Sequence, residues 1–195
     1  MIFLVPYAYD RMPGGKPRES VPANRLGGKA RCDALIDVAT RALKINHEDG
    51  PYGIWCDFVF SAGYTKDSPT KPTLVVIESI AEQMAKYVRS TGIEFASSVD
   101  RHDLVWGTYF ETVRAIRRIS STTVIAHNRG YKNNGVYVGT NLGHLPRVWL
   151  CWLFLKPKGG KIHFVLANHS FAPKEWLQET AKFFQYLYRF VFKKW

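Results

Sequence analysis

Short apolar runs recur along the chain and predict buried strands. Four of them lie at residues 2–5, 54–60, 136–139 and 162–167, and a fifth candidate strand lies at 93–99. The four runs do not alternate strictly between apolar and polar residues, which is typical of strands covered on both faces. We therefore predict a mainly parallel sheet.

Segments with apolar residues at helical spacing separate these strands. They lie at 31–43, 73–91, 107–119 and 148–155, and an aromatic-rich helix ends the chain at 173–195. Alternating strands and helices predict an α/β fold with helices on both faces of the sheet. The stretch 120–135 is mostly polar with a short apolar run at 124–126, and we expect an extra strand or an excursion there.

The final helix is apolar around most of its circumference, which leaves two interpretations. It docks in a groove of the domain, or it meets a partner or a bilayer surface. A soluble monomer rarely exposes so much contiguous apolar surface. We therefore expect residues 173–195 to be docked on the domain.

Composition limits the size, the partners and the compartment. The 195 residues, 46% of them hydrophobic, are enough for one domain, 1–195, with a sizeable core. The net charge of +11 favours anionic partners such as phosphate-bearing metabolites, nucleic acid or an acidic lipid surface. No leader peptide or membrane-spanning run is recognisable, so we expect a cytoplasmic protein. Cys32, Cys56 and Cys151 are scattered, which favours reduced, buried thiols.

Candidate chemistry concentrates between Thr140 and Arg147, in the stretch TNLGHLPR. A β-branched run leads into it and an amphipathic run leads out, so it is predicted to be a strand-to-helix turn, where backbone N–H groups favour an anion. His144 and Arg147 lie three residues apart on one helix face. Arg147 can grip phosphate or carboxylate, and His144 can change charge near neutral pH. The alternative is that His144 packs on a neighbour and Arg147 is a solvated surface charge.

Polar or small residues also lie at two other predicted element ends. The strand at 54–60 ends in Ser61-Ala62-Gly63, which leaves room for a ligand near the backbone or forms an ordinary turn. Glu111 is expected in the first turn of a helix, where a carboxylate also suits the helix dipole. Metal-ligand spacings and a glycine-rich phosphate loop are absent from the sequence, so we expect no metal.

Several of these residues follow the motif pattern of a known family. The matching positions are Thr140, His144 and Arg147 after a strand, Arg31 at a helix start, the Ser61-Ala62-Gly63 turn, and Thr108 with Glu111 at a later helix start. In this pattern, scattered over roughly residues 2–170, the chain resembles the YdcF/SanA/ElyC-like family, in its soluble YdcF-like branch.

The resemblance implies a Rossmann-like three-layer α/β/α sandwich with a polar crevice at the strand ends. One branch of that family resembles an S-adenosylmethionine binder, and membrane-anchored branches are linked to cell-envelope and lipid-carrier metabolism. No reaction is settled for the group.

These features lead to one main hypothesis: a small phosphate-bearing or nucleotide-like metabolite, with S-adenosylmethionine as one candidate, binds at the carboxyl ends of the strands. The residues expected to line the crevice are Arg31, Ser61, Gly63, Thr108, Glu111, Thr140, Asn141, His144 and Arg147. If the chain is an enzyme, His144 and Glu111 are its acid/base pair, and Arg147 stabilises developing negative charge.

Two rival functions stay open at this point. Nucleic-acid binding fits the charge and the aromatic content, but no recognition motif is present and the aromatic residues follow core periodicity. A steep loss of DNA binding with salt would identify that function. Peripheral membrane or partner contact through the final helix would instead be lost when residues 176–195 are removed, while the rest of the domain stays folded.

Overall fold

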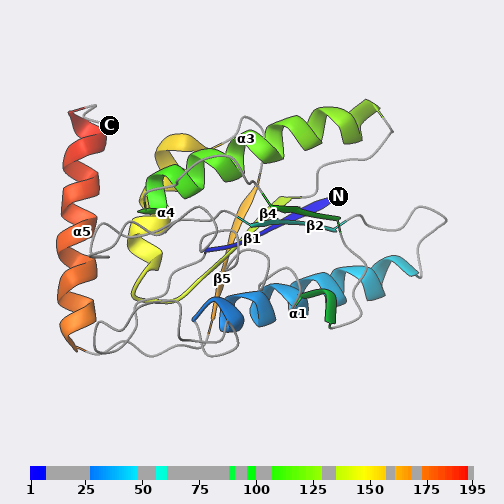
Figure 1. Ribbon diagram of the computed structural model, residues 1–195, viewed down its shortest axis with the longest axis horizontal. Helices are drawn as coiled ribbons and strands as arrows, with labels where there is room; N and C mark the ends of the chain where they lie inside the picture. The colour runs from blue at the N-terminus through cyan, green and yellow to red at the C-terminus, as the bar shows by residue number, and fades with distance from the viewer. Residues whose placement is uncertain are drawn as a thin grey trace.

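The computed structural model describes residues 1–7, 27–47, 56–60, 88–90, 96–99, 107–128, 135–156, 161–167 and 173–192. These residues contain a five-stranded sheet in which every neighbouring pair of strands is parallel (Figure 1). The strands are β1 (Ile2–Pro6), β2 (Cys56–Phe60), β3 (Ala96–Val99), β4 (Gly135–Thr140) and β5 (Ile162–Leu166). Each strand coincides with a predicted apolar run, so the predicted α/β class and parallel sheet are confirmed.

The strand order across the sheet is β3-β2-β1-β4-β5, which puts β1 at the centre. The chain passes from β1 to β2 on one side and reaches the other side of β1 only with β4. Pro6 lies opposite Gly139 in this central pair, and the backbone N–H of Tyr7 donates to the Gly139 carbonyl at 3.3 Å. In open parallel sheets, ligands bind at the carboxyl ends of the strands where the direction of winding reverses. Here that point is the end of β1 and β4.

Helices lie on both faces of the sheet (Figure 1). They are α1 (Gly27–His47), α3 (Gly107–Asn128), α4 (Leu145–Leu155) and α5 (Pro173–Val191). The main core lies between the sheet and α3 with α4, and it joins Phe3, Val5, Val59, Ala115, Ile119, Val136, Val138, Val148 and Trp152. α1 covers the opposite face.

The approach of α1 to β4 requires a glycine. A Cβ atom added at Gly139 would lie 2.9 Å from Leu35 Cδ1 and 3.2 Å from the backbone oxygen of Arg31. Real Cβ contacts of that kind are repulsive, so any larger residue would push α1 outward. The missing side chain therefore lets Arg31 lie beside the end of the central strand pair.

α3 corrects the prediction for the stretch after residue 119. We expected an extra strand or an excursion over 120–135, but the helix continues to Asn128. Its last turns contain β-branched and hydroxyl residues that are individually modest helix formers. Their hydroxyls are accommodated within the helix, because Ser121 Oγ donates to the Arg118 carbonyl at 2.9 Å and Thr123 Oγ1 donates to the Ile119 carbonyl at 2.7 Å.

The other helix predictions are matched to different extents. The helix predicted at 31–43 is longer at both ends. The helix predicted at 73–91 lies mostly outside the described residues, of which 88–90 are helical. Within the described part of the chain, no helix combines the length and the apolarity needed to cross a bilayer.

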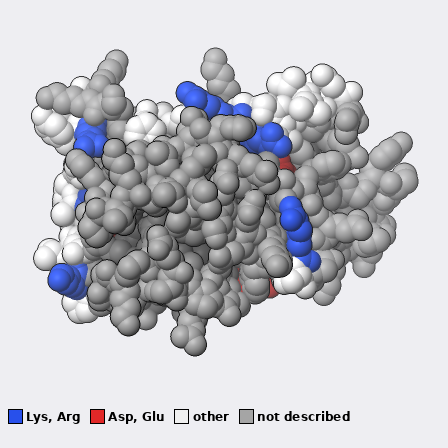
Figure 2. Space-filling model, in the orientation of Figure 1, with Lys and Arg blue, Asp and Glu red and all other residues white. Residues whose placement is uncertain are grey.

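α5 packs against α4 along one face. Tyr186 joins Leu150 and Cys151 in a small core, and the partly buried side chains around it are Tyr109, Phe183, Leu187 and Phe190. The opposite face of α5 carries large exposed apolar side chains. Figure 2, in the orientation of Figure 1, shows Lys and Arg side chains along the edge of the molecule that α5 forms.

Candidate functional site

The predicted strand-to-helix turn joins β4 to α4. Asn141 organises it: the backbone N–H of His144 contacts both the carbonyl and the side-chain Oδ1 of Asn141 at 3.1 Å, and the N–H of Leu145 donates to the same carbonyl at 2.9 Å. Pro146 follows in the first helical turn, where its fixed φ and missing N–H are tolerated. The turn thus fixes His144 at the N-terminal boundary of α4.

His144 is almost completely buried at the end of the sheet, with 1% of its surface exposed. Its Nε2 lies 3.0 Å from the Thr108 hydroxyl, and its ring meets the Tyr7 ring edge to face at 5.9 Å. Burial is the main cause that lowers the pKa of His144 well below its usual value, and the positive charges of Arg147, Arg31 and Lys182 lower it further. The imidazole is therefore neutral at neutral pH and lies in a positive electrostatic potential.

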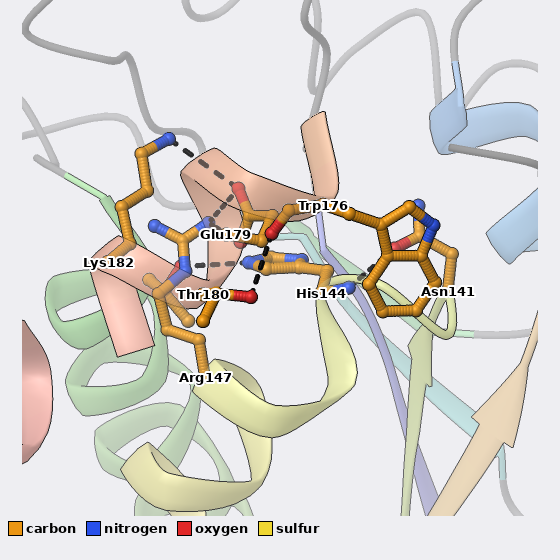
Figure 3. Close-up of polar contacts among 8 residues, drawn as sticks. Asn141, His144, Arg147, Trp176, Glu179, Thr180 and Lys182 are labelled. Atoms are coloured by element: carbon orange, nitrogen blue, oxygen red, sulfur yellow. Dashed lines mark hydrogen bonds and ion pairs between the residues drawn. The ribbon is translucent and has the colours of Figure 1, made fainter. Parts of the chain in front are cut away.

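Arg147 is buried as well, and its partner is a carboxylate of the chain itself. Its Nη2 lies 3.3 Å and 3.0 Å from the two carboxylate oxygens of Glu179 on α5 (Figure 3). Lys182 Nζ lies 3.5 Å from the same carboxylate, and the guanidinium carbon of Arg147 stands 5.5 Å from the centre of the Tyr186 ring. Thus Arg147 does grip an anion, but in this structure that anion is Glu179.

Arg31 approaches the same region from the other face of the sheet. Its side chain is fully buried, and Nη1 donates to the backbone carbonyl of Tyr7, directly after β1. The Tyr7 hydroxyl accepts a hydrogen bond from Trp152 Nε1 at 3.0 Å and bonds to the Thr112 hydroxyl. Buried hydrogen bonds of this kind hold both the strand end and the polar side chains around it in fixed positions.

Glu111 is buried on α3, one residue beyond the first turn that the sequence predicted for it. The pKa values of Tyr7 and Tyr186 are raised mainly by burial, and the negative charge of Glu111 adds to both shifts. The same charge contributes to the raised pKa of the Cys151 thiol, about 12, of which burial is again the main cause. Its carboxylate therefore acts on the same interior as His144, on the side of Tyr7 and Cys151.

Two buried polar atoms at the turn have no hydrogen-bond partner among the residues that the structure describes. They are the hydroxyl of Thr140, which is 0% exposed, and the amide nitrogen Nδ2 of Asn141, which is 1% exposed. Buried polar groups are almost always hydrogen-bonded, since an unpaired one costs roughly 1–3 kcal/mol. Both groups are therefore available to hydrogen-bond a ligand at the end of β4.

The structure brings most of the expected site residues together. Arg31, Thr108, Glu111, Thr140, Asn141, His144 and Arg147 are all buried near the ends of the central strands. Ser61 and Gly63 lie outside the described residues. Among the described residues, no group of three or more His, Cys, Asp or Glu side chains is placed to hold a metal ion.

Sequence reasoning missed Tyr7, Thr112 and Glu179. Tyr7 comes two residues after the strand predicted at 2–5, so its position near a strand end was a usable signal. Glu179 is a carboxylate on the face of α5 that packs inward, and a charge on a packed helix face requires a buried partner. Thr112 lies one helical turn after Thr108, to whose carbonyl its hydroxyl donates at 2.7 Å.

Comparison of the chain with models of protein families, with curated proteins and with solved structures yields no match.

Proposed function

We propose that this protein binds a small phosphate-bearing or nucleotide-like metabolite at the carboxyl ends of β1 and β4. One observation carries the proposal: the buried Thr140 hydroxyl and Asn141 amide lack partners among the described residues at the point where the sheet changes winding direction. Both groups can donate a hydrogen bond to an anionic oxygen. The strand order is also consistent with the Rossmann-like arrangement that the family resemblance implies.

The electrostatics of the turn favour an anion. Three cations, on Arg31, Arg147 and Lys182, lower the pKa of His144. A phosphate group would be stabilised by the same potential that disfavours the imidazolium ion. S-adenosylmethionine carries a sulfonium cation, so phosphate-bearing compounds suit this potential better.

Glu179 sets a limit on how the anion binds. Its carboxylate already contacts both Arg147 and Lys182. An incoming phosphate therefore shares Arg147 and Lys182 with Glu179 or displaces it. Most of its binding free energy then comes from Arg31 and from the unpaired donors of Thr140 and Asn141. Charge-assisted hydrogen bonds to such donors are the stronger kind.

Two titratable groups near the proposed site, His144 and Glu111, would supply acid/base chemistry if a reaction follows binding. Neutral His144 can accept a proton at Nε2, which now faces the Thr108 hydroxyl. Because its pKa is lowered, it is a weak base in the free protein, and bound negative charge would raise that pKa toward the working range of a general base. Glu111 supplies the second titratable group of the pair.

Calorimetric titration with inorganic phosphate, ADP and S-adenosylmethionine tests the proposal, combined with mass spectrometry of small molecules that co-purify with the protein. We expect the phosphate-bearing probes to bind and to raise the pKa of His144, which is measured by NMR. Tighter binding of S-adenosylmethionine than of ADP would show that the site binds that cofactor and not a phosphate-bearing metabolite. If no probe binds at millimolar concentration and nothing co-purifies, the proposal is wrong.

A further inference from the structure

The outer face of α5 is a continuous apolar stripe. It consists of Leu177, Phe184, Tyr188, Val191 and Phe192, with exposed fractions of 74%, 61%, 52%, 59% and 58%. Their spacings of seven, four, three and one residues put them on one side of the helix, opposite the face that packs on α4. We call these five residues the outer stripe.

The polar residues of α5 place positive charge beside this stripe. Lys182 and Arg189 are seven residues apart and therefore lie on the same flank of the helix, and Lys174 is exposed near its start. Glu179 faces inward, and the face seen in Figure 2 shows no described carboxylate along this edge; the sequence of α5 also contains Glu175. The whole chain carries a net charge of +11. The charged side chains that the structure describes beside the outer stripe are thus cationic.

We infer that α5 docks the protein on an anionic lipid surface, lying parallel to the membrane with the outer stripe inserted among the acyl chains. This combination of one apolar face, flanking Lys and Arg, and large aromatic residues characterises helices that lie in the membrane interface. Long cationic side chains at the boundary can reach the lipid phosphates while their methylene groups stay in the apolar layer. Anionic headgroups neutralise the cations of α5, whereas a second copy of the chain would bring like charges together.

The inner face of α5 allows docking without unfolding. It is held by the Arg147–Glu179 ion pair and by Tyr186 in the small core with α4. Phe154 of α4 is half-exposed and stacks on Phe190 of α5 at 4.6 Å between ring centres, which adds to the packing of this inner face. The outer stripe is therefore presented on a helix fixed to the folded domain. This inference does not depend on the proposed metabolite site.

The test is co-flotation of the full chain with phosphatidylcholine vesicles that contain about one-third phosphatidylserine, compared with phosphatidylcholine alone. We expect binding to the anionic vesicles that weakens with salt. Leu177→Glu and Phe184→Glu should each weaken it about tenfold or more, since each puts a charge where an apolar side chain inserts. Arg189→Gln should weaken it about fivefold. The matched control is Ile125→Glu, which changes an equally exposed apolar residue near the far end of α3 (Figure 1).

The outcomes are distinct. Loss of vesicle binding in the two stripe variants but not in Ile125→Glu, with unchanged thermal unfolding, supports the inference. It is overturned if the wild-type chain does not float with anionic vesicles, or if all variants float equally. It is also overturned if sedimentation shows a wild-type dimer that Leu177→Glu dissociates, because a second copy then covers the outer stripe.

Discussion

Thr140→Val tests the candidate site with the smallest structural change. Valine has the same shape as threonine and replaces only the hydroxyl by a methyl group. Thr140 is fully buried, and its hydroxyl has no hydrogen-bond partner among the described residues. Its backbone is held independently, since the Thr140 carbonyl accepts a hydrogen bond from the Ala167 N–H at 2.7 Å. The substitution therefore removes one donor without disturbing the strand.

The substitution has opposite effects on stability and on binding. An unpaired buried hydroxyl costs the free protein roughly 1–3 kcal/mol, so its removal should leave the free energy of unfolding unchanged or raise it by about 1 kcal/mol. For a chain of this size that corresponds to a rise in Tm of roughly 2–4 °C. In the complex the same hydroxyl would bond a charged oxygen, a contact worth roughly 1.5–3 kcal/mol, so affinity should fall about ten- to a hundredfold.

Urea denaturation and calorimetric titration with ADP measure the two quantities. Thr122→Val on α3 is the control, because Thr122 is a partly buried threonine away from the turn; it should not change the affinity. A structural threonine would behave in the opposite way. If Thr140→Val lowers stability by 1 kcal/mol or more, as expected for a lost native hydrogen bond, and leaves ADP affinity unchanged, the reasoning is refuted.

Three further predictions concern buried charge and close packing. Arg147→Ala removes the closer of the two cations that contact the buried Glu179 carboxylate and leaves Lys182 at 3.5 Å, so it should lower the free energy of unfolding by about 3 kcal/mol in urea; a loss below about 1 kcal/mol, the value of a surface pair, would show that the pair is solvated. Burial raises the pKa of Asp57 from 3.8 to about 6, with Arg118 opposing that shift, so the folded state keeps a proton that the unfolded chain has already released. Stability should therefore fall by about 3 kcal/mol as pH rises from about 4 through 6, and Asp57→Asn should remove this slope; identical pH profiles for the two proteins would contradict this. Gly139→Ala should lower the free energy of unfolding by about 1–3 kcal/mol, because the added methyl group pushes α1 away from β4. The measurement is a lower urea midpoint, and an unchanged midpoint would mean that α1 moves at no energetic cost.

The sheet and the β4–α4 turn could be predicted because their signals are local. An apolar run without alternation identifies a strand covered on both faces. A β-branched run followed by a Pro-containing amphipathic run defines the turn around His144. The parallel arrangement then follows, since helices separate the strands along the chain.

Local sequence patterns could not predict the contacts inside the candidate site. Arg147 and Glu179 are separated by β5 and its connections, and Tyr7 and the Thr112 hydroxyl are 105 residues apart. The sequence could place His144 and Arg147 on one face, but the partner of Arg147 lies on α5 and the Thr108 hydroxyl that meets His144 lies on α3. The extension of α3 was missed for a related reason, since its β-branched residues argue against a helix locally.

Glu179 connects the two faces of α5. On its inner side it neutralises Arg147 and contacts Lys182, two of the three cations that lower the pKa of His144. The outer stripe lies on the opposite side of the same helix turns. Removal of that carboxylate would leave the charges of Arg147 and Lys182 less compensated beside the β4–α4 turn.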